Sequence, residues 1–81
     1  LEAKLVGDLR VRPGRRQLLR ATLEARGVTL EVRPYADQKS GVLRSLTATN
    51  ALIDLADDVS HVPDGSTVRV LPLGPPDVVT E

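Results

Sequence analysis

The sequence of 81 residues predicts an all-β domain, a small antiparallel barrel of bent hairpins with one short helix. Three observations predict this class. Short runs of alternating apolar and polar residues recur along the chain, as they do in strands that bury one face. Glycine- and proline-containing turn signals separate these runs. Only residues 42–50 have the three- and four-residue apolar spacing of a helix.

The first half of the chain predicts one extended element followed by a hairpin. The extended element covers residues 5–11 and ends at Pro13-Gly14, a pair that favours a turn. In the hairpin, residues 17–24 and 28–33 form the strands, with Gly27 suited to a left-handed conformation in the loop between them. The side chains expected to point inward from this hairpin are Leu19, Ala21, Leu23, Val28, Leu30 and Val32.

The second half predicts the helix and the remaining strands. Ser40 suits the N-cap of the helix, because its hydroxyl can accept a hydrogen bond from a first-turn N–H, and Asn50 suits its end. Buried strands are expected at residues 51–55 and 67–73, with turns at residues 56–58 and 63–65. We expect residues 1–74 to form a single domain and residues 75–81 a loose tail.

Composition excludes several classes of protein. The chain has no cysteine, which excludes a disulfide framework and a thiolate metal site. It has no apolar run of membrane-spanning length and no signal peptide, so we expect a cytoplasmic protein without a membrane partner. A single aromatic residue, Tyr35, and no overall basic excess argue against nucleic-acid binding. The chain opens in the middle of a pattern without Met, which predicts a piece of a longer protein.

The net charge of zero conceals an uneven distribution. Residues 1–44 carry ten Lys/Arg against five Asp/Glu, whereas residues 45–81 carry one against six. Such a division can mark a surface that faces an anion. The alternative is that folding of a small barrel simply mixes the two sets of charges.

Four blocks in a fixed order resemble the C-terminal domain of the MoeA family, the molybdopterin molybdenumtransferases, to which the gephyrin E region also belongs. The likeness runs from about residue 5 to residue 73 and rests on the order of the blocks rather than on any one motif. The blocks are PGRRQLLR at residues 13–20, QKSGVLRSL at 38–46, NALI at 50–53 and DGSTVRVLPL at 64–73.

The resemblance implies a dimeric, multidomain transferase that inserts molybdate into adenylylated molybdopterin, with magnesium, late in molybdenum cofactor synthesis. In such enzymes this domain is a barrel of the β-clip type that borders the cleft, and the larger domains supply the catalytic groups. The implied partners are therefore those domains, the dimer mate and the molybdopterin-nucleotide substrate. The chain itself is expected to bind no cofactor and to be inactive alone.

Two residues match positions that the family uses near its cleft, namely Arg20 and Ser40, and Lys39 stands where the family usually has glycine. Arg20 can hold oxyanion oxygens with its two-pronged guanidinium group, or it can pair across the hairpin with Glu24 or Glu31. Ser40 can present its hydroxyl and neighbouring N–H groups to an anion, or serve as a plain helix cap. Lys39 can attract the same anion or point into solvent.

Two other functions fit the same residues. The domain can be a non-catalytic module that binds a peptide or subunit through an apolar groove, or a structural barrel that touches no ligand. No catalytic arrangement is recognisable. His61 stands alone in an acidic region and is expected at the surface, and the turn carboxylates Asp57, Asp58 and Asp64 do not have the spacing of a magnesium site.

Overall fold

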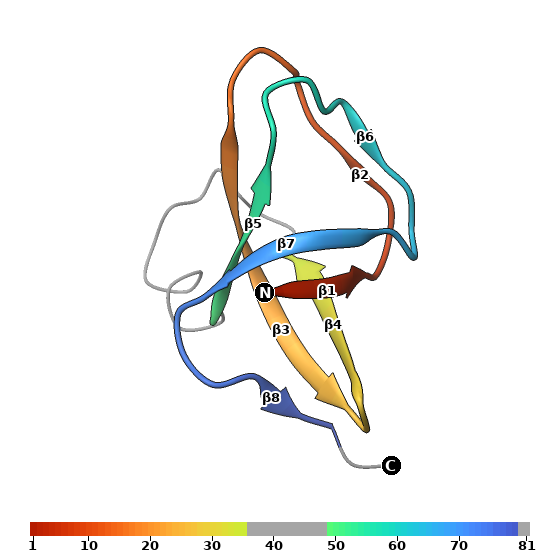
Figure 1. Ribbon diagram of the computed structural model, residues 1–81, viewed down its shortest axis with the longest axis vertical. Coiled ribbons are helices and arrows are strands. Elements are labelled where there is room, and N and C mark those ends of the chain that lie inside the picture. Colours follow the sequence, from red (N-terminus) through yellow and green to blue (C-terminus); the bar gives the residue numbers. More distant parts are fainter. Residues whose placement is uncertain (36–48, 80–81) are drawn as a thin grey trace.

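The computed structural model describes residues 1–35 and 49–79, and all the regular structure in these residues is β. Figure 1 shows the strands in space. They are β1 (Glu2–Leu5), β2 (Leu9–Arg10), β3 (Gln17–Arg26), β4 (Thr29–Pro34), β5 (Ala51–Leu55), β6 (His61–Val62), β7 (Thr67–Pro72) and β8 (Asp77–Val78). The helix expected at residues 42–50 falls mostly outside the described residues, and Asn50, its expected end, leads into β5.

Five strands close into a small barrel, which confirms the predicted fold class. The strand order is β4-β1-β7-β5-β3, and the β3–β4 hairpin joins the last strand to the first. All of these pairings are antiparallel except β1–β4, where Lys4 and Leu5 pair in parallel with Glu31 and Val32. In Figure 1, β1 and β7 cross the molecule side by side, with β3 and β5 running steeply past them.

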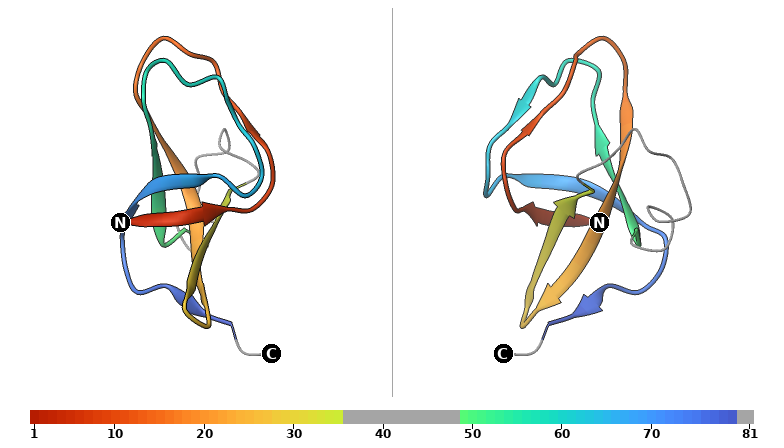
Figure 2. Two further views of the ribbon diagram at one scale, coloured as in Figure 1. Left: turned by 45° about the vertical axis from the view of Figure 1, so that its right-hand side comes forward. Right: turned by 180° about the vertical axis from the view of Figure 1, so that it is seen from behind.

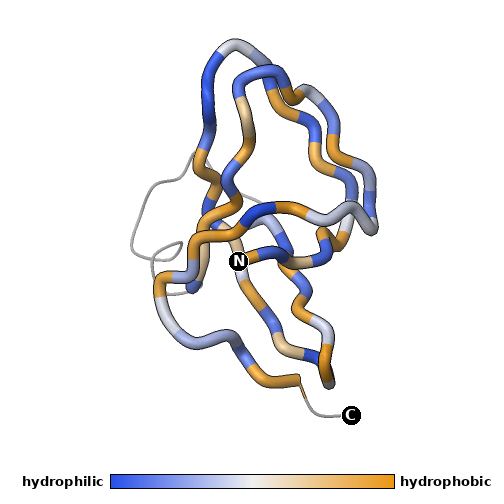
Figure 3. Tube along the Cα trace, in the orientation of Figure 1, coloured by the Kyte–Doolittle hydropathy of each residue, from blue (hydrophilic) through white to orange (hydrophobic). Residues whose placement is uncertain are grey.

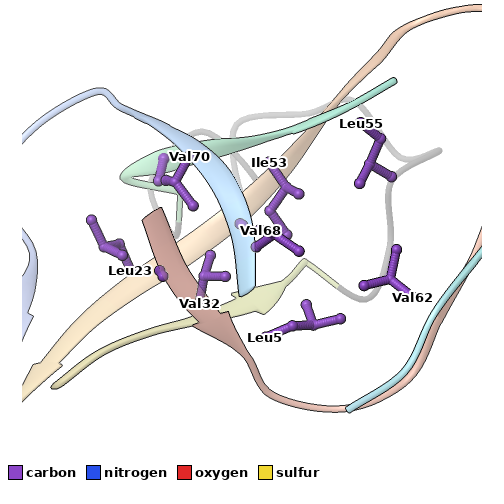
Figure 4. Packing of buried hydrophobic residues seen from close by; sticks show 11 residues of the cluster. Leu5, Leu23, Val32, Ile53, Leu55, Val62, Val68 and Val70 are labelled. Atoms are coloured by element: carbon purple, nitrogen blue, oxygen red, sulfur yellow. The ribbon is translucent and has the colours of Figure 1, made fainter. Parts of the chain in front are cut away.

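The core consists of small and medium-sized aliphatic side chains taken from alternate positions of the barrel strands. The alternation is visible along the trace in Figure 3, and Figure 4 shows the packed side chains. Leu5, Val32, Ile53 and Val70 are fully buried. The full cluster is Ala3, Leu5, Ala21, Leu23, Val32, Ala51, Ile53, Leu55, Val62, Val68 and Val70. Strict alternation of this kind places the intervening residues on the outside.

The β3–β4 hairpin was correctly predicted, apart from its turn. Arg26 pairs with Thr29, so the loop is only Gly27-Val28. Gly27 has φ 63°, whereas Val28, like every other non-glycine residue that the structure describes, does not have positive φ; this matches the type II′ turn favoured by twisted hairpins. The prediction that Val28 points inward is wrong, because the turn leaves this side chain fully exposed.

The extended element expected at residues 5–11 is two strands rather than one. Gly7, with φ 91°, breaks the chain between β1 in the barrel and β2 outside it. β2 pairs with β6 in a two-stranded ribbon that rises from the barrel, as Figures 1 and 2 show. Apolar residues at 5, 9 and 11 gave no sign of this break, since a kink at glycine leaves the alternation nearly intact.

Part of the segment expected as a loose tail is paired. β8 lies parallel to β3 at Glu24 and Ala25, and the Val79 N–H donates to the Ala25 carbonyl over 3.0 Å. Pro75 and Pro76 favour an extended backbone before β8, which suits a strand as well as a tail. Two residues are too few for strand alternation to be visible in the sequence.

Candidate functional site

The outward side chains of β3, β5 and β7 form one continuous surface, which we call the outer face. The pairing register sets its rows. Leu18 lies opposite Asp54, and Asp54 opposite Arg69. In the next row Arg20 lies opposite Leu52, and Leu52 opposite Leu71. These two rows of the outer face combine the cationic side chains Arg20 and Arg69 with aliphatic ones, and Asp54 is the carboxylate between them.

Arg20 lies near the middle of β3 and is half-buried. Its carbonyl accepts a hydrogen bond from the Tyr35 N–H over 2.8 Å, and the neighbouring Ala21 carbonyl accepts one from the Asn50 N–H over 3.2 Å. Residues 36–48 join these two anchors in sequence, and they include Lys39 and Ser40, which lie outside the described residues. Both ends of the segment that carries the other two candidate residues are thus attached beside Arg20.

The two carboxylates considered as alternative partners of Arg20, Glu24 and Glu31, form ion pairs with other arginines. Glu24 accepts a hydrogen bond from Arg33 Nε over 2.8 Å, and Glu31 accepts one from Arg26 Nε over 3.3 Å. Both are cross-strand ion pairs on the β3–β4 hairpin. Such partly exposed pairs stabilise a hairpin only slightly, by up to about 1 kcal/mol.

Asn50 has a structural role that its expected position at a helix end did not suggest. Its Oδ1 accepts from the Leu23 N–H over 2.6 Å, and its Nδ2 donates to the Leu23 carbonyl over 2.9 Å. The side-chain amide therefore pairs with β3 as a backbone peptide group would. It fills the edge of β3 between the part covered by β5 and the part covered by β8. Nδ2 also donates to the Pro75 carbonyl over 3.3 Å, which ties down the approach to β8.

A second group of charges on the outer face was not recognised from the sequence. Arg16 donates from Nε and Nη2 to the two carboxylate oxygens of Asp54, over 2.8 and 2.7 Å. The Asp54 side chain is 7% exposed, whereas that of Arg16 is 64% exposed. With Ala56 and Arg69, these residues line an open depression of about 430 Å³. An aspartate between Ile53 and Leu55 in an aliphatic strand was the available sign.

The ion pair shifts the protonation equilibria of both partners. Hydrogen bonds from Arg16 lower the pKa of Asp54 despite its partial desolvation, and the charges of Arg16 and Arg69 add to this effect. The same hydrogen bonds raise the pKa of Arg16. Asp54 is therefore an anion, and Arg16 a cation, throughout the neutral range.

The junction between barrel and ribbon holds two further carboxylates and the histidine. Asp64 accepts from the Gly7 N–H over 2.7 Å, and Asp8 accepts from the Asp64 N–H over 2.8 Å, a bond that lowers the pKa of Asp8. His61 Nε2 lies 3.6 Å from Asp8 Oδ2. Among residues 1–35 and 49–79, no three carboxylate or histidine side chains come together in a way that would hold a metal ion.

Comparison with known families gives one result. The sequence model of the MoeA C-terminal region (domain IV) matches residues 2–73, which covers every strand except β8. No curated protein matches the chain significantly. In the part of the chain that the structure describes, no helix has the length and apolar character needed to cross a membrane.

Proposed function

Because this chain belongs to the MoeA C-terminal region (domain IV) family, we propose that it is the C-terminal domain of a molybdopterin molybdenumtransferase. In this role it forms part of the wall of the cleft where molybdate is inserted into adenylylated molybdopterin, during molybdenum cofactor biosynthesis. The catalytic groups and Mg²⁺ belong to the other domains and the dimer mate, in the cytoplasm. The isolated domain has no activity of its own.

One observation supports this assignment more than any other. Tyr35 and Asn50, which flank residues 36–48, are hydrogen-bonded to Arg20 and Ala21, adjacent residues of β3. The family pattern assigns its two cleft residues in this domain to β3 and to that segment, at Arg20 and Ser40. The described residues on either side of that segment, Tyr35 and Asn50, are thus attached next to the arginine with which Ser40 and Lys39 are expected to act.

The chemistry of these three residues suits a tetrahedral oxyanion such as molybdate or a substrate phosphate. A guanidinium group presents two parallel N–H donors to a pair of oxygens. A serine hydroxyl supplies one further donor, and a lysine supplies a point charge. These groups bind and orient an anion and carry out no proton transfer, which fits a cleft wall rather than a catalytic centre.

The test is made in the full-length protein that carries this domain, expressed in a host without its own molybdenumtransferase. Arg20→Ala is expected to lower the molybdenum content of the cofactor about tenfold, the loss of one or two charge-assisted hydrogen bonds. Arg20→Lys is expected to recover part of this loss, because lysine keeps the positive charge but lacks the two parallel N–H donors of the guanidinium group. Ser40→Ala and Lys39→Ala are expected to lower it less.

Arg33→Ala is the matched control, since Arg33 is an exposed arginine on the same hairpin. Molybdenum insertion is expected to be unchanged in this variant. If Arg20→Ala and Arg33→Ala give equal cofactor content at limiting molybdate, Arg20 has no role in the cleft and the proposal fails.

A second candidate function, a non-catalytic module that binds another protein or peptide, is favoured by the apolar part of the outer face. Leu18 of β3 and Leu71 of β7 are 49% and 39% exposed, and Leu73, directly after β7, is 61% exposed. Exposed aliphatic side chains grouped on one sheet face are typical of contact surfaces. Chemical-shift changes confined to these leucines on addition of the remaining domains, with none at Arg20 on addition of molybdate, would favour this function.

A further inference from the structure

The depression at Arg16, Asp54 and Arg69 has the features of an anion site that is separate from Arg20. Its lining residues lie near the start of β3, near the end of β5 and in β7. Arg16 precedes β3, Asp54 lies in β5, and Arg69 lies opposite it in β7. Three segments far apart in the sequence thus contribute its charged groups.

Asp54 acts as an anchor for Arg16. The nearly buried carboxylate takes two N–H groups of the guanidinium, one on each oxygen, which fixes the plane of the fork. A guanidinium has five N–H donors, so three remain for another acceptor. The exposed position of Arg16 leaves them accessible. A held arginine loses less side-chain entropy when it binds a ligand than a free surface arginine does.

Arg69 completes the opposite side of the depression. It faces Asp54 across the β5–β7 pairing, and its charge acts on Asp54, yet the described residues make no ion pair with it within 4.0 Å. Two arginines against one carboxylate give the depression a net charge of +1. Leu18, the nearest outward neighbour on β3, is aliphatic, whereas Glu2 of β1 lies opposite Arg69 and is a carboxylate with which a bound anion must compete.

We propose that Arg16 and Arg69 together bind a phosphate-type oxyanion in this depression, with Asp54 as the residue that positions Arg16. Two guanidinium groups from separate segments suit a tetrahedral anion, whose several oxygens can face both, better than a flat carboxylate, which one guanidinium satisfies. The phosphate is either inorganic or part of a nucleotide. Arg20 lies outside the depression, so this site does not depend on the proposed function.

The test is a titration of the 81-residue chain followed through the arginine Nε–Hε signals in ¹H–¹⁵N spectra. Sodium phosphate, AMP and sodium acetate are added separately at constant ionic strength, because general charge screening also moves arginine signals. We expect saturable shifts at Arg16 and Arg69 with phosphate, at millimolar concentration. AMP binding more tightly than phosphate identifies a nucleotide as the source, and equal or weaker binding identifies inorganic phosphate.

Variants make the result specific. Arg69→Gln, which breaks no ion pair of the described residues, is expected to weaken phosphate binding about tenfold, the equivalent of one charge-assisted bond. Arg16→Lys is expected to weaken it as well, while dispersed amide signals show that the barrel is intact. Arg10→Gln removes the same charge from the ribbon and should leave binding unchanged.

Three outcomes overturn the proposal. They are shifts that do not saturate, shifts of equal size at all arginines, and acetate binding as tightly as phosphate. If phosphate does not bind at Arg16 and Arg69 but Arg20→Ala still lowers molybdenum insertion, this proposal fails and the proposed function stands.

Discussion

Replacing Asn50 with alanine is expected to destabilise the barrel more than any other single change of a polar side chain in the described residues. The variant loses three hydrogen bonds, two to the backbone of Leu23 and one to Pro75. The Leu23 N–H and carbonyl lie in a partly buried stretch of β3, where lost partners are only partly replaced by water. At about 1–2 kcal/mol for each of these two groups, the free energy of unfolding falls by about 2–4 kcal/mol.

That loss is large for a domain of this size. Small domains unfold with about 5–15 kcal/mol, and 1 kcal/mol corresponds to a shift of about 4–8 °C in Tm. We therefore expect Asn50→Ala to lower Tm by at least about 8 °C. Urea unfolding followed by far-ultraviolet circular dichroism measures the change, since the chain has no tryptophan and only one tyrosine. Hydrogen exchange at the Leu23 amide should accelerate by more than the loss of overall stability alone would cause.

Two further variants make this prediction refutable. Gln17→Ala is the matched control, because Gln17 also donates from its side-chain amide to a backbone carbonyl, that of Arg12, but at an exposed site. Its expected cost is below about 1 kcal/mol. Asn50→Asp keeps the acceptor but turns a carboxylate oxygen toward the carbonyls of Leu23 and Pro75. Its folded-state pKa is therefore raised, so this variant recovers stability as the pH falls through that value. If Asn50→Ala lowers the free energy of unfolding no more than Gln17→Ala does, the Asn50 amide does not stabilise the edge of β3 as a paired strand would, and the reasoning is refuted.

The remaining predictions concern charge, the turn and the core. Because the pKa of Asp54 is lower in the folded than in the unfolded state, its ionised form stabilises the fold above the unfolded pKa, and this stability is lost as the pH falls through the folded pKa. In Asp54→Asn, the free energy of unfolding should therefore fall less steeply with decreasing pH below about pH 4. Gly27→Ala should cost about 1–2 kcal/mol in urea unfolding, for its positive φ alone, since no atom lies within 4 Å of an added Cβ. Ile53→Val should cost about 0.5–1.5 kcal/mol and Ile53→Ala about 2–5 kcal/mol, because Ile53 is fully buried; equal costs would mean that the core closes around the gap.

The sequence predicted what depends on local alternation. The β3–β4 hairpin and β7 have a period of two that their buried side chains follow, and β5 was predicted as a buried strand from its short aliphatic run. The length of the hairpin turn was missed by one residue, which is enough to turn Val28 from inside to outside. The parallel pairing of β1 with β4 has no local signal, because it depends on how the barrel closes.

The candidate site was predictable only where a family pattern assists. Arg20 was placed correctly on the polar side of β3, but its position relative to Tyr35 and Asn50 depends on hydrogen bonds that no periodicity encodes. The Arg16–Asp54 ion pair joins residues 38 positions apart. Asn50 was interpreted as a helix end because asparagine suits caps and turns, and the same short amide proved able to substitute for a peptide group.

β1 is a four-residue strand at the start of the chain, and it is the piece that separates a closed barrel from an open sheet. It pairs with β4 along one edge and β7 along the other. Without it both of those strands present unpaired N–H and carbonyl groups, and such edges recruit strands from other molecules. With Gly7 as a hinge, β1 can also fill the same gap in a second copy, which is the geometry of domain swapping. Expression of this domain from a start point past Leu5, which removes β1, is therefore expected to yield oligomers or aggregates joined through the open edges of β4 and β7 rather than a monomeric barrel.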